Sequence, residues 1–118
     1  MSIDNAIASV AVKDLRVAVP WYETLLGRKA DSAPMPEVAE WKFRGGGWLQ
    51  VYQLPERAGA GSVTLAVSDL DKVAARVEGL GIDTSQRTSS AKVKTLMIVD
   101  QDGNHIAFAQ AIDPTMAR

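Results

Sequence analysis

The chain contains one histidine, His105, within the stretch DQDGNHIAF at residues 100–108. An imidazole close to carboxylates is suited to binding a divalent metal or to acid–base catalysis near neutral pH. Asp102 and Gly103 also form a turn signal, and an aspartate in such a place commonly serves the turn itself. His105 is therefore a candidate metal ligand, a candidate catalytic base, or a side chain beside a pocket whose chemistry lies elsewhere.

An internal repeat indicates which elements position this stretch. VAVKDL at residues 10–15 returns as LAVSDL at residues 65–70, an offset of 55 residues. GWLQVYQ at residues 47–53 is matched by NHIAFAQ at residues 104–110, an offset of 57. Ordered matches at a nearly constant offset indicate that the chain is two copies of one module.

Each module is predicted to be a strand, a helix and then two or three strands, which is an α+β fold. IASVAV and SVTLAV are rich in β-branched residues and predict the first strands. Asp14 is expected to cap a helix that ends at Gly27, although Pro20 should kink that helix or move its start later. In the second module, Ser68 and Asp71 have the spacing of a capping box.

The segments after each helix predict hairpins and loops. Apolar runs separated by glycines follow both helices, and the second pair is expected to turn near Asp102 and Gly103. SAPMPEVA, residues 32–39, predicts a loop, and PERAGAGS, residues 55–62, predicts the linker between the modules. The chain is thus expected to be a single domain with modules at about residues 1–56 and 60–112.

Strand alternation sorts the side chains onto two faces. Ala8, Val10 and Val12 share an apolar face that is expected to lie under the helix. The opposite faces combine aromatic walls with a few polar groups, as a small-molecule cavity requires. The candidate binding residues are Ser9, Trp48, Gln50, Tyr52, Ser62, Thr64 and His105, with Trp41 as a further wall. Each one alone is more commonly a packing residue, so the prediction rests on the group.

Composition limits the classes of partner. The 118 residues include 13 lysines and arginines against 14 aspartates and glutamates, a net charge of -1 without a basic stripe, so nucleic acid is not expected as a partner. No apolar run approaches the roughly 20 residues that span a bilayer. No signal peptide is predicted, and the expected location is the cytoplasm. The absence of cysteine excludes disulfides, thiolate metal sites and cysteine nucleophiles.

The sequence resembles the vicinal oxygen chelate superfamily, which includes glyoxalase I, extradiol dioxygenases and bleomycin resistance proteins. The stretches that carry the resemblance are VAVKDL…PWYETLLG, GGWLQVYQL, SVTLAVSDLD and DQDGNHIAF, which cover nearly the whole chain. DQDGNHI is similar to the family's Asp-Pro-Asp-Gly-Asn turn, with Gln101 in place of proline. The resemblance implies paired βαβββ modules, each curling a sheet around a cavity, usually in a homodimer.

The resemblance also carries the family's four metal-ligand positions onto this chain. Metal-using members usually have histidine, a carboxylate or glutamine, histidine and glutamate at the positions that here hold Ile7, Gln50, Ser62 and Ala107. Isoleucine and alanine cannot coordinate a metal, and a neutral amide and hydroxyl are weak ligands. No metal or other cofactor is therefore expected. His105 lies two positions before Ala107, so it is expected either beside the pocket or on the surface at a hairpin end.

Two functions are consistent with these patterns. The first is a metal-free protein that sequesters or senses a small, partly aromatic ligand between Trp48 and Tyr52. A net charge of -1 argues against a strongly cationic drug as that ligand. The alternative is an enzyme of the same superfamily, a lyase, isomerase or dioxygenase-like protein. It would use His105 as acid or base and Tyr52 as proton donor, or a weakly bound metal.

Overall fold

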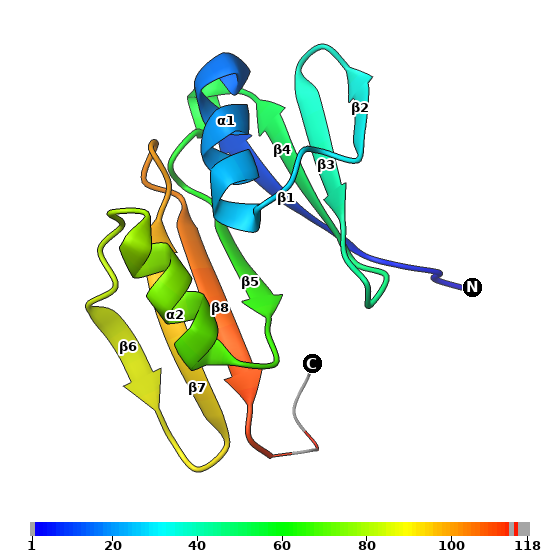
Figure 1. Ribbon diagram of the computed structural model, residues 1–118. Coiled ribbons are helices and arrows are strands. Elements are labelled where there is room, and N and C mark those ends of the chain that lie inside the picture. The colour runs from blue at the N-terminus through cyan, green and yellow to red at the C-terminus, as the bar shows by residue number, and fades with distance from the viewer. Residues whose placement is uncertain (1, 114, 116–118) are drawn as a thin grey trace. The chain divides into compact units, whose positions relative to one another are not determined.

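The computed structural model describes residues 2–113 and 115, and its elements form two repeated sets (Figure 1). The first set is β1 (Ile7–Val12), α1 (Leu15–Leu26), β2 (Ser32–Met35), β3 (Val38–Lys42) and β4 (Trp48–Gln53). A short 3-10 helix, η1 (Pro55–Arg57), leads to the second set, which is β5 (Ser62–Ala66), α2 (Leu70–Gly79), β6 (Gln86–Ser89), β7 (Val93–Val99) and β8 (His105–Ala111). Each set is a βαβββ module, so the predicted α+β fold is confirmed.

Both modules have the same sheet topology. The strand orders are β1-β4-β3-β2 and β5-β8-β7-β6. The first strand of each module pairs in parallel with the last, and the other pairs are antiparallel. The register is repeated as well, because Ile7 lies opposite Trp48 and Ser62 lies opposite His105. The structure therefore confirms the equivalences that the sequence repeat predicted.

In the first module, α1 packs on one face of its sheet. Asp14 caps the helix by accepting a hydrogen bond from the Arg16 amide, and Gly27 ends it with a φ of 76°, as predicted. The buried Tyr22 faces the buried Trp41, with ring centroids 6.2 Å apart. Pro20 lies inside the helix, yet the helix begins directly after Asp14. The expected later start is therefore wrong.

The second module repeats this packing with α2. Leu70, Ala74 and Val77 are the buried residues of the helix. Its N-cap is Asp69, whose side chain accepts from the Lys72 amide at 3.2 Å. The predicted capping box of Ser68 and Asp71 is therefore wrong by one residue.

A glutamine at the end of each last strand holds the start of the helix in the same module. The amide of Leu15 donates to Gln53 Oε1 at 2.9 Å, and the amide of Leu70 donates to Gln110 Oε1 at 2.8 Å. The first amides of a helix have no partner within the helix itself. The repeated glutamines satisfy one of them in each module, and they fix the helix relative to its sheet.

One further segment bears on the predictions. Residues 32–39 were expected as a loop, but they form β2 and the start of β3, joined by a tight connection. β2 is a short strand with an irregular register, and it contains a proline, which hides the strand pattern in the sequence. Within the described residues, no helix is long and apolar enough to cross a membrane.

The chain divides into two compact units that differ slightly from the predicted modules. The first unit runs to Gly61 and also includes Gln101–Asn104, the turn that precedes β8. The second unit comprises Ser62–Asp100 and the residues from His105 onward. The predicted modules, at about residues 1–56 and 60–112, assigned this turn to the second half of the chain.

Asp102 and Asn104 explain why the turn belongs to the first unit. Asp102 Oδ2 accepts a hydrogen bond from the Lys13 amide at 2.9 Å. Asn104 is 0% exposed, and its Nδ2 donates to the Ala11 carbonyl at 2.8 Å. Its Oδ1 accepts from the amides of Gly59 and Gly61 at 3.1 and 2.8 Å. Buried polar groups of this kind must be paired, so these bonds tie the turn to the end of β1 and to the linker.

Candidate functional site

The first sheet has one face that α1 does not cover, and we call it the open face. Residues directly opposite one another on neighbouring strands point to the same side of a sheet. The strand pairing therefore places the open-face residues in three rows, which are Ile7, Trp48 and Lys42; Ser9, Gln50, Glu40 and Ser32; and Ala11, Tyr52, Val38 and Met35. The structure thus brings together four predicted residues: Ser9, Trp48, Gln50 and Tyr52.

Hydrogen bonds join three side chains of the middle row. Ser9 Oγ donates to Gln50 Oε1 at 3.2 Å, and Gln50 Nε2 donates to Glu40 Oε2 at 3.0 Å. A carboxylate only accepts hydrogen bonds, so Glu40 requires the NH₂ group of Gln50 on its side. The amide oxygen must then face Ser9. Glu40 therefore sets the direction of hydrogen bonding across the row.

Aromatic rings flank this row along β4. Trp48 and Tyr52 are both half-buried, and each lies two residues from Gln50 on the same face. Lys42 Nζ lies 5.8 Å from the centroid of the Trp48 ring, within the range of a cation–π contact. The open face thus offers two flat apolar surfaces on either side of a polar strip.

The backbone of Lys42 is held by an ion pair between two residues that precede it in the sequence. The Arg28 guanidinium donates to the Lys42 carbonyl, and Asp31 Oδ2 accepts from the Lys42 amide at 2.7 Å. Arg28 and Asp31 also pair with each other. The hydrogen bond from Arg28, followed by that from the Lys42 amide, lowers the pKa of the Asp31 carboxyl. These contacts fix the end of β3, and with it the position of the lysine beside Trp48.

Trp41 does not lie on the open face. It is 0% exposed, it pairs with Leu49 on the helix side of the sheet, and its Nε1 donates to the Arg28 carbonyl at 3.1 Å. The expectation that Trp41 forms a wall of the binding site thus differs from its place in the structure. It is a core residue beneath α1.

The second sheet carries the remaining predicted residues on its equivalent face. Ser62 and His105 lie in one row with Val99, and Thr64 lies in the next row with Ala107 and Met97. The His105 side chain is exposed, and it forms no hydrogen bond or ion pair with any other described residue. It lines a cavity of about 430 Å³ within the second unit, together with Ile82, Asp83, Gln86, Met97, Ile98 and Val99.

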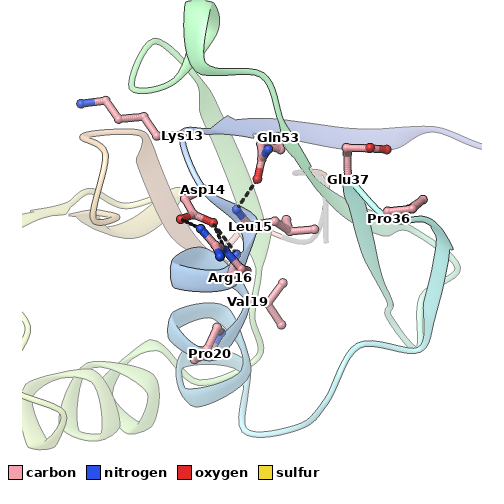
Figure 2. Close-up of a pocket in the computed structure, with 9 residues that line it drawn as sticks. All are labelled: Lys13, Asp14, Leu15, Arg16, Val19, Pro20, Pro36, Glu37 and Gln53. Atoms are coloured by element: carbon pink, nitrogen blue, oxygen red, sulfur yellow. Dashed lines mark hydrogen bonds and ion pairs between the residues drawn. The ribbon is translucent and has the colours of Figure 1, made fainter.

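The first unit has a cavity at the start of α1, away from the open face. It has a volume of about 780 Å³ and is lined by Lys13, Asp14, Leu15, Arg16, Val19, Pro20, Pro36, Glu37 and Gln53 (Figure 2). Figure 2 shows the hydrogen bond from the Leu15 amide to the Gln53 side chain and, separately, the ion pair between Asp14 and Arg16. The side-chain hydrogen bond from Arg16 lowers the pKa of the Asp14 carboxyl. The predicted binding residues are not among those that line this cavity.

The four positions that the family uses for metal ligands do not fit a catalytic metal here. Ile7 and Ala107 carry no donor atom, and Gln50 Oε1 already accepts a hydrogen bond from Ser9. Only the neutral hydroxyl of Ser62 remains, whereas catalytic divalent metals typically take about three protein ligands. Among the described residues, no group of three or more His, Cys, Asp or Glu side chains is placed to hold a metal ion.

Glu40 and Lys42 are open-face residues that the sequence did not predict. Their positions depend on the register between β3 and β4, which are joined by a glycine-rich turn. A shift of one residue in that register moves every side chain to the other face. A β-hairpin with the turn at residues 44–47 would have predicted both, but the sequence alone leaves several turn lengths open.

Comparisons with known proteins agree on the fold. No family model matches the chain, and no curated protein matches it significantly. A glyoxalase/bleomycin resistance protein of known structure from Catenulispora acidiphila is 34% identical over 91% of this chain and 97% of that one, with a TM-score of 0.81. TnmS3, an antibiotic binding protein from a Streptomyces species, is 23% identical over 94% and 98% of the two chains, with a TM-score of 0.80.

A second glyoxalase/bleomycin resistance protein, also from a Streptomyces species, is 24% identical over 91% of this chain and all of that one, with a TM-score of 0.78. The two Streptomyces proteins share the fold. The Catenulispora protein shares the fold as well, and it adds sequence identity along nearly its whole length. The chain therefore belongs to the glyoxalase/bleomycin resistance family of the vicinal oxygen chelate superfamily.

Proposed function

We propose that this protein binds a small, planar, partly aromatic molecule without a metal, and so sequesters or senses it. The observation that carries the proposal is the open face, where Trp48 and Tyr52 flank a hydrogen-bonded polar row. Ligand sites typically combine apolar and aromatic surface with a few placed polar groups. Ser62, Thr64 and His105 stay proposed ligand contacts of the equivalent face of the second sheet, as a related site within that unit. We also propose, as expected from the sequence, that the protein acts in the cytoplasm.

The polar row suits binding because it is already ordered. Gln50 is held from both sides by Ser9 and Glu40, so a ligand that contacts the row does not have to order these side chains. Stacking on a tryptophan contributes about 0.5–1.5 kcal/mol beyond the burial of area. The fold shared with TnmS3, which is described as an antibiotic binding protein, supports the same role.

The arrangement around His105 favours binding over catalysis. A catalytic histidine is normally oriented by a hydrogen bond from a third group. His105 has no such partner among the described residues, although it lines a cavity. The side chains at the family's metal positions do not fit a metal either. The proposed binding function requires neither acid–base catalysis by His105 nor a bound metal.

The test uses quinoline, a flat two-ring molecule, as a probe for the open face. Trp48→Ala should weaken quinoline binding by about two- to tenfold, and Trp48→Phe should weaken it less, because a smaller ring keeps part of the stacking surface. Equilibrium dialysis gives the affinities, and denaturant unfolding of the same variants gives their stability. Trp21→Phe, a change on α1 outside the open face, is the control.

Two outcomes would count against the proposal. If both Trp48 variants fold and bind quinoline as tightly as the parent, the open face is not the binding surface. If Trp48→Ala instead loses roughly 3–5 kcal/mol of stability with no selective change in binding, then Trp48 is a packing residue.

A further inference from the structure

We infer that Glu40 determines which ligands the open face accepts, and that it selects planar molecules with an N–H donor at the ring edge, such as aromatic amines. This inference rests on the proposed binding function and adds the chemical class of the ligand. Glu40 is half-buried, and among the described residues its side chain has one partner, Gln50, whose Nε2 donates to Oε2 at 3.0 Å. Its second oxygen, Oε1, can therefore accept a hydrogen bond from a ligand.

The second module provides an internal control for a purely structural role. The row Ser9–Gln50–Glu40 of the first sheet corresponds by register to the row Thr64–Ala107–Met97 of the second. The second sheet thus forms the same four-stranded topology with alanine and methionine at these positions. A glutamine and a glutamate in the middle of the face are not required by the fold, so their chemistry is free to serve recognition.

The polarity of the row favours a donor over an acceptor on the ligand. Glu40 presents a carboxylate oxygen, and Gln50 already uses its own oxygen for Ser9. A ligand carboxylate next to Glu40 would be repelled, whereas an N–H group would form a charge-assisted hydrogen bond. Glu40 lies diagonally across from Trp48, and diagonal neighbours have side chains about 7–8 Å apart. A two-ring molecule stacked on Trp48 can reach Glu40 with its edge.

Lys42 distinguishes a neutral donor from a permanent cation. Its ammonium lies on the same face, 5.8 Å from the Trp48 ring centroid, and its charge opposes that of Glu40 two residues away. A ligand cation stacked on the ring would be repelled by this ammonium, whereas a neutral ligand would not. A neutral aromatic amine gains the hydrogen bond to Glu40 without that repulsion, so the N–H group and not a positive charge is the feature recognised.

Four quinoline probes separate these possibilities: quinoline, 3-aminoquinoline, N-methylquinolinium and quinoline-3-carboxylate. The parent protein should bind 3-aminoquinoline about tenfold more tightly than quinoline. N-methylquinolinium, a cation without an N–H group, should gain nothing over quinoline, and the carboxylate should bind most weakly. Equilibrium dialysis at neutral pH gives all four affinities on the full chain.

Three variants assign the preference to Glu40. Glu40→Gln and Glu40→Met should reduce the tenfold preference for 3-aminoquinoline over quinoline to about twofold or less. Glu40→Met copies the residue that the second module has at the equivalent position, Met97, so it is expected to fold. Glu37→Gln removes a carboxylate that lines the cavity at the start of α1 and should leave the preference intact.

The inference is overturned if the preference survives in both Glu40 variants, or if the parent binds N-methylquinolinium or the carboxylate at least as well as 3-aminoquinoline. If quinoline binding still depends on Trp48 in that case, the proposed function stands and only the ligand class is wrong. If none of the four probes shows Trp48-dependent binding, the proposed function fails and the inference fails with it.

Discussion

Asn104 shows how one side chain can decide where a turn belongs. Its amide is fully buried, and it serves two glycine amides and one carbonyl from parts of the chain far apart in sequence. The side chain of the neighbouring His105 is exposed and has no such contact with another described residue. In the stretch that drew attention to the histidine, the fully buried polar side chain is thus the asparagine before it.

Replacing Asn104 with alanine should therefore destabilise the protein by about 3 kcal/mol, because the amides of Gly59 and Gly61 and the Ala11 carbonyl lose their buried partner. Denaturant unfolding measures the change. Asn5→Ala, at an exposed asparagine that bonds the Gly46 carbonyl and the Ala6 amide, should cost about 1 kcal/mol or less. Equal stability of the two variants would mean that water replaces the amide without cost.

At the scale of elements, the sequence predicted what strand and helix patterns encode locally. The order of strand and helix, Asp14 and Gly27 as the ends of α1, and the turn at Gly103 all follow from residue type and spacing. What failed was decided by neighbours in space. Ser68 and Asp69 are both good caps, and tertiary packing selects Asp69.

The register of β3 could not be predicted for the same reason, and this affected the expected site more. Strand alternation alone does not say which face of β3 matches which face of β4, because the glycine-rich turn between them can take several lengths. For this reason the sequence placed Trp41 among the expected binding residues and did not predict Glu40 on the open face. The repeated first and last strands were placed correctly, because each copy of the repeat supports the other.

The end of β3 should respond to pH through Asp31. Its folded pKa is lowered below the ordinary value of 3.8, chiefly by the hydrogen bond from Arg28. A lowered folded pKa contributes stability that is present above 3.8 and is lost as the pH falls through the folded value. Asp31→Asn should therefore lower Tm at neutral pH. The difference in Tm between this variant and the parent should shrink as the pH falls below 3.8.

Thermal melts across this pH range check the expectation. Asp4→Asn is the control, because Asp4 has no ion pair among the described residues. A Tm difference between Asp31→Asn and the parent that stays constant down to acid pH would show that the ion pair with Arg28 does not contribute to stability. Asp31 is exposed, so solvent screening will keep the effect small.

At the scale of the whole molecule, some members of the superfamily bind a metal, whereas the side chains at the corresponding positions of this chain predict none. At the positions where the resemblance places the superfamily's metal ligands, this chain has Ile7 and Ala107, whose side chains carry no donor atom. Protein purified without chelators should therefore carry far less than one zinc, nickel, iron or manganese per chain, as measured by elemental analysis. A near-stoichiometric metal that survives dialysis would contradict the metal-free proposal.

We also propose that the protein forms a homodimer. Each unit exposes large apolar side chains, among them Ile7, Met35 and Val99, which are 52–56% exposed. Exposed apolar surface of this kind often marks a protein interface. Analytical ultracentrifugation should give a dimer at tens of micromolar protein, on the order expected for a stable interface. A monomer at that concentration would count against the proposal.

The turn at Gln101–Asn104 also limits how the gene could be divided. The repeat invites the idea that each half could be expressed as a separate polypeptide, as for two fused copies of an ancestral module. A cut at Gly61 would leave the first fragment without Asp102 and Asn104, and its two glycine amides would have no acceptor. The second fragment would carry that turn with nothing to receive it. Neither half should therefore fold as a separate polypeptide, and the two fragments should recover a native fold only when both are present together.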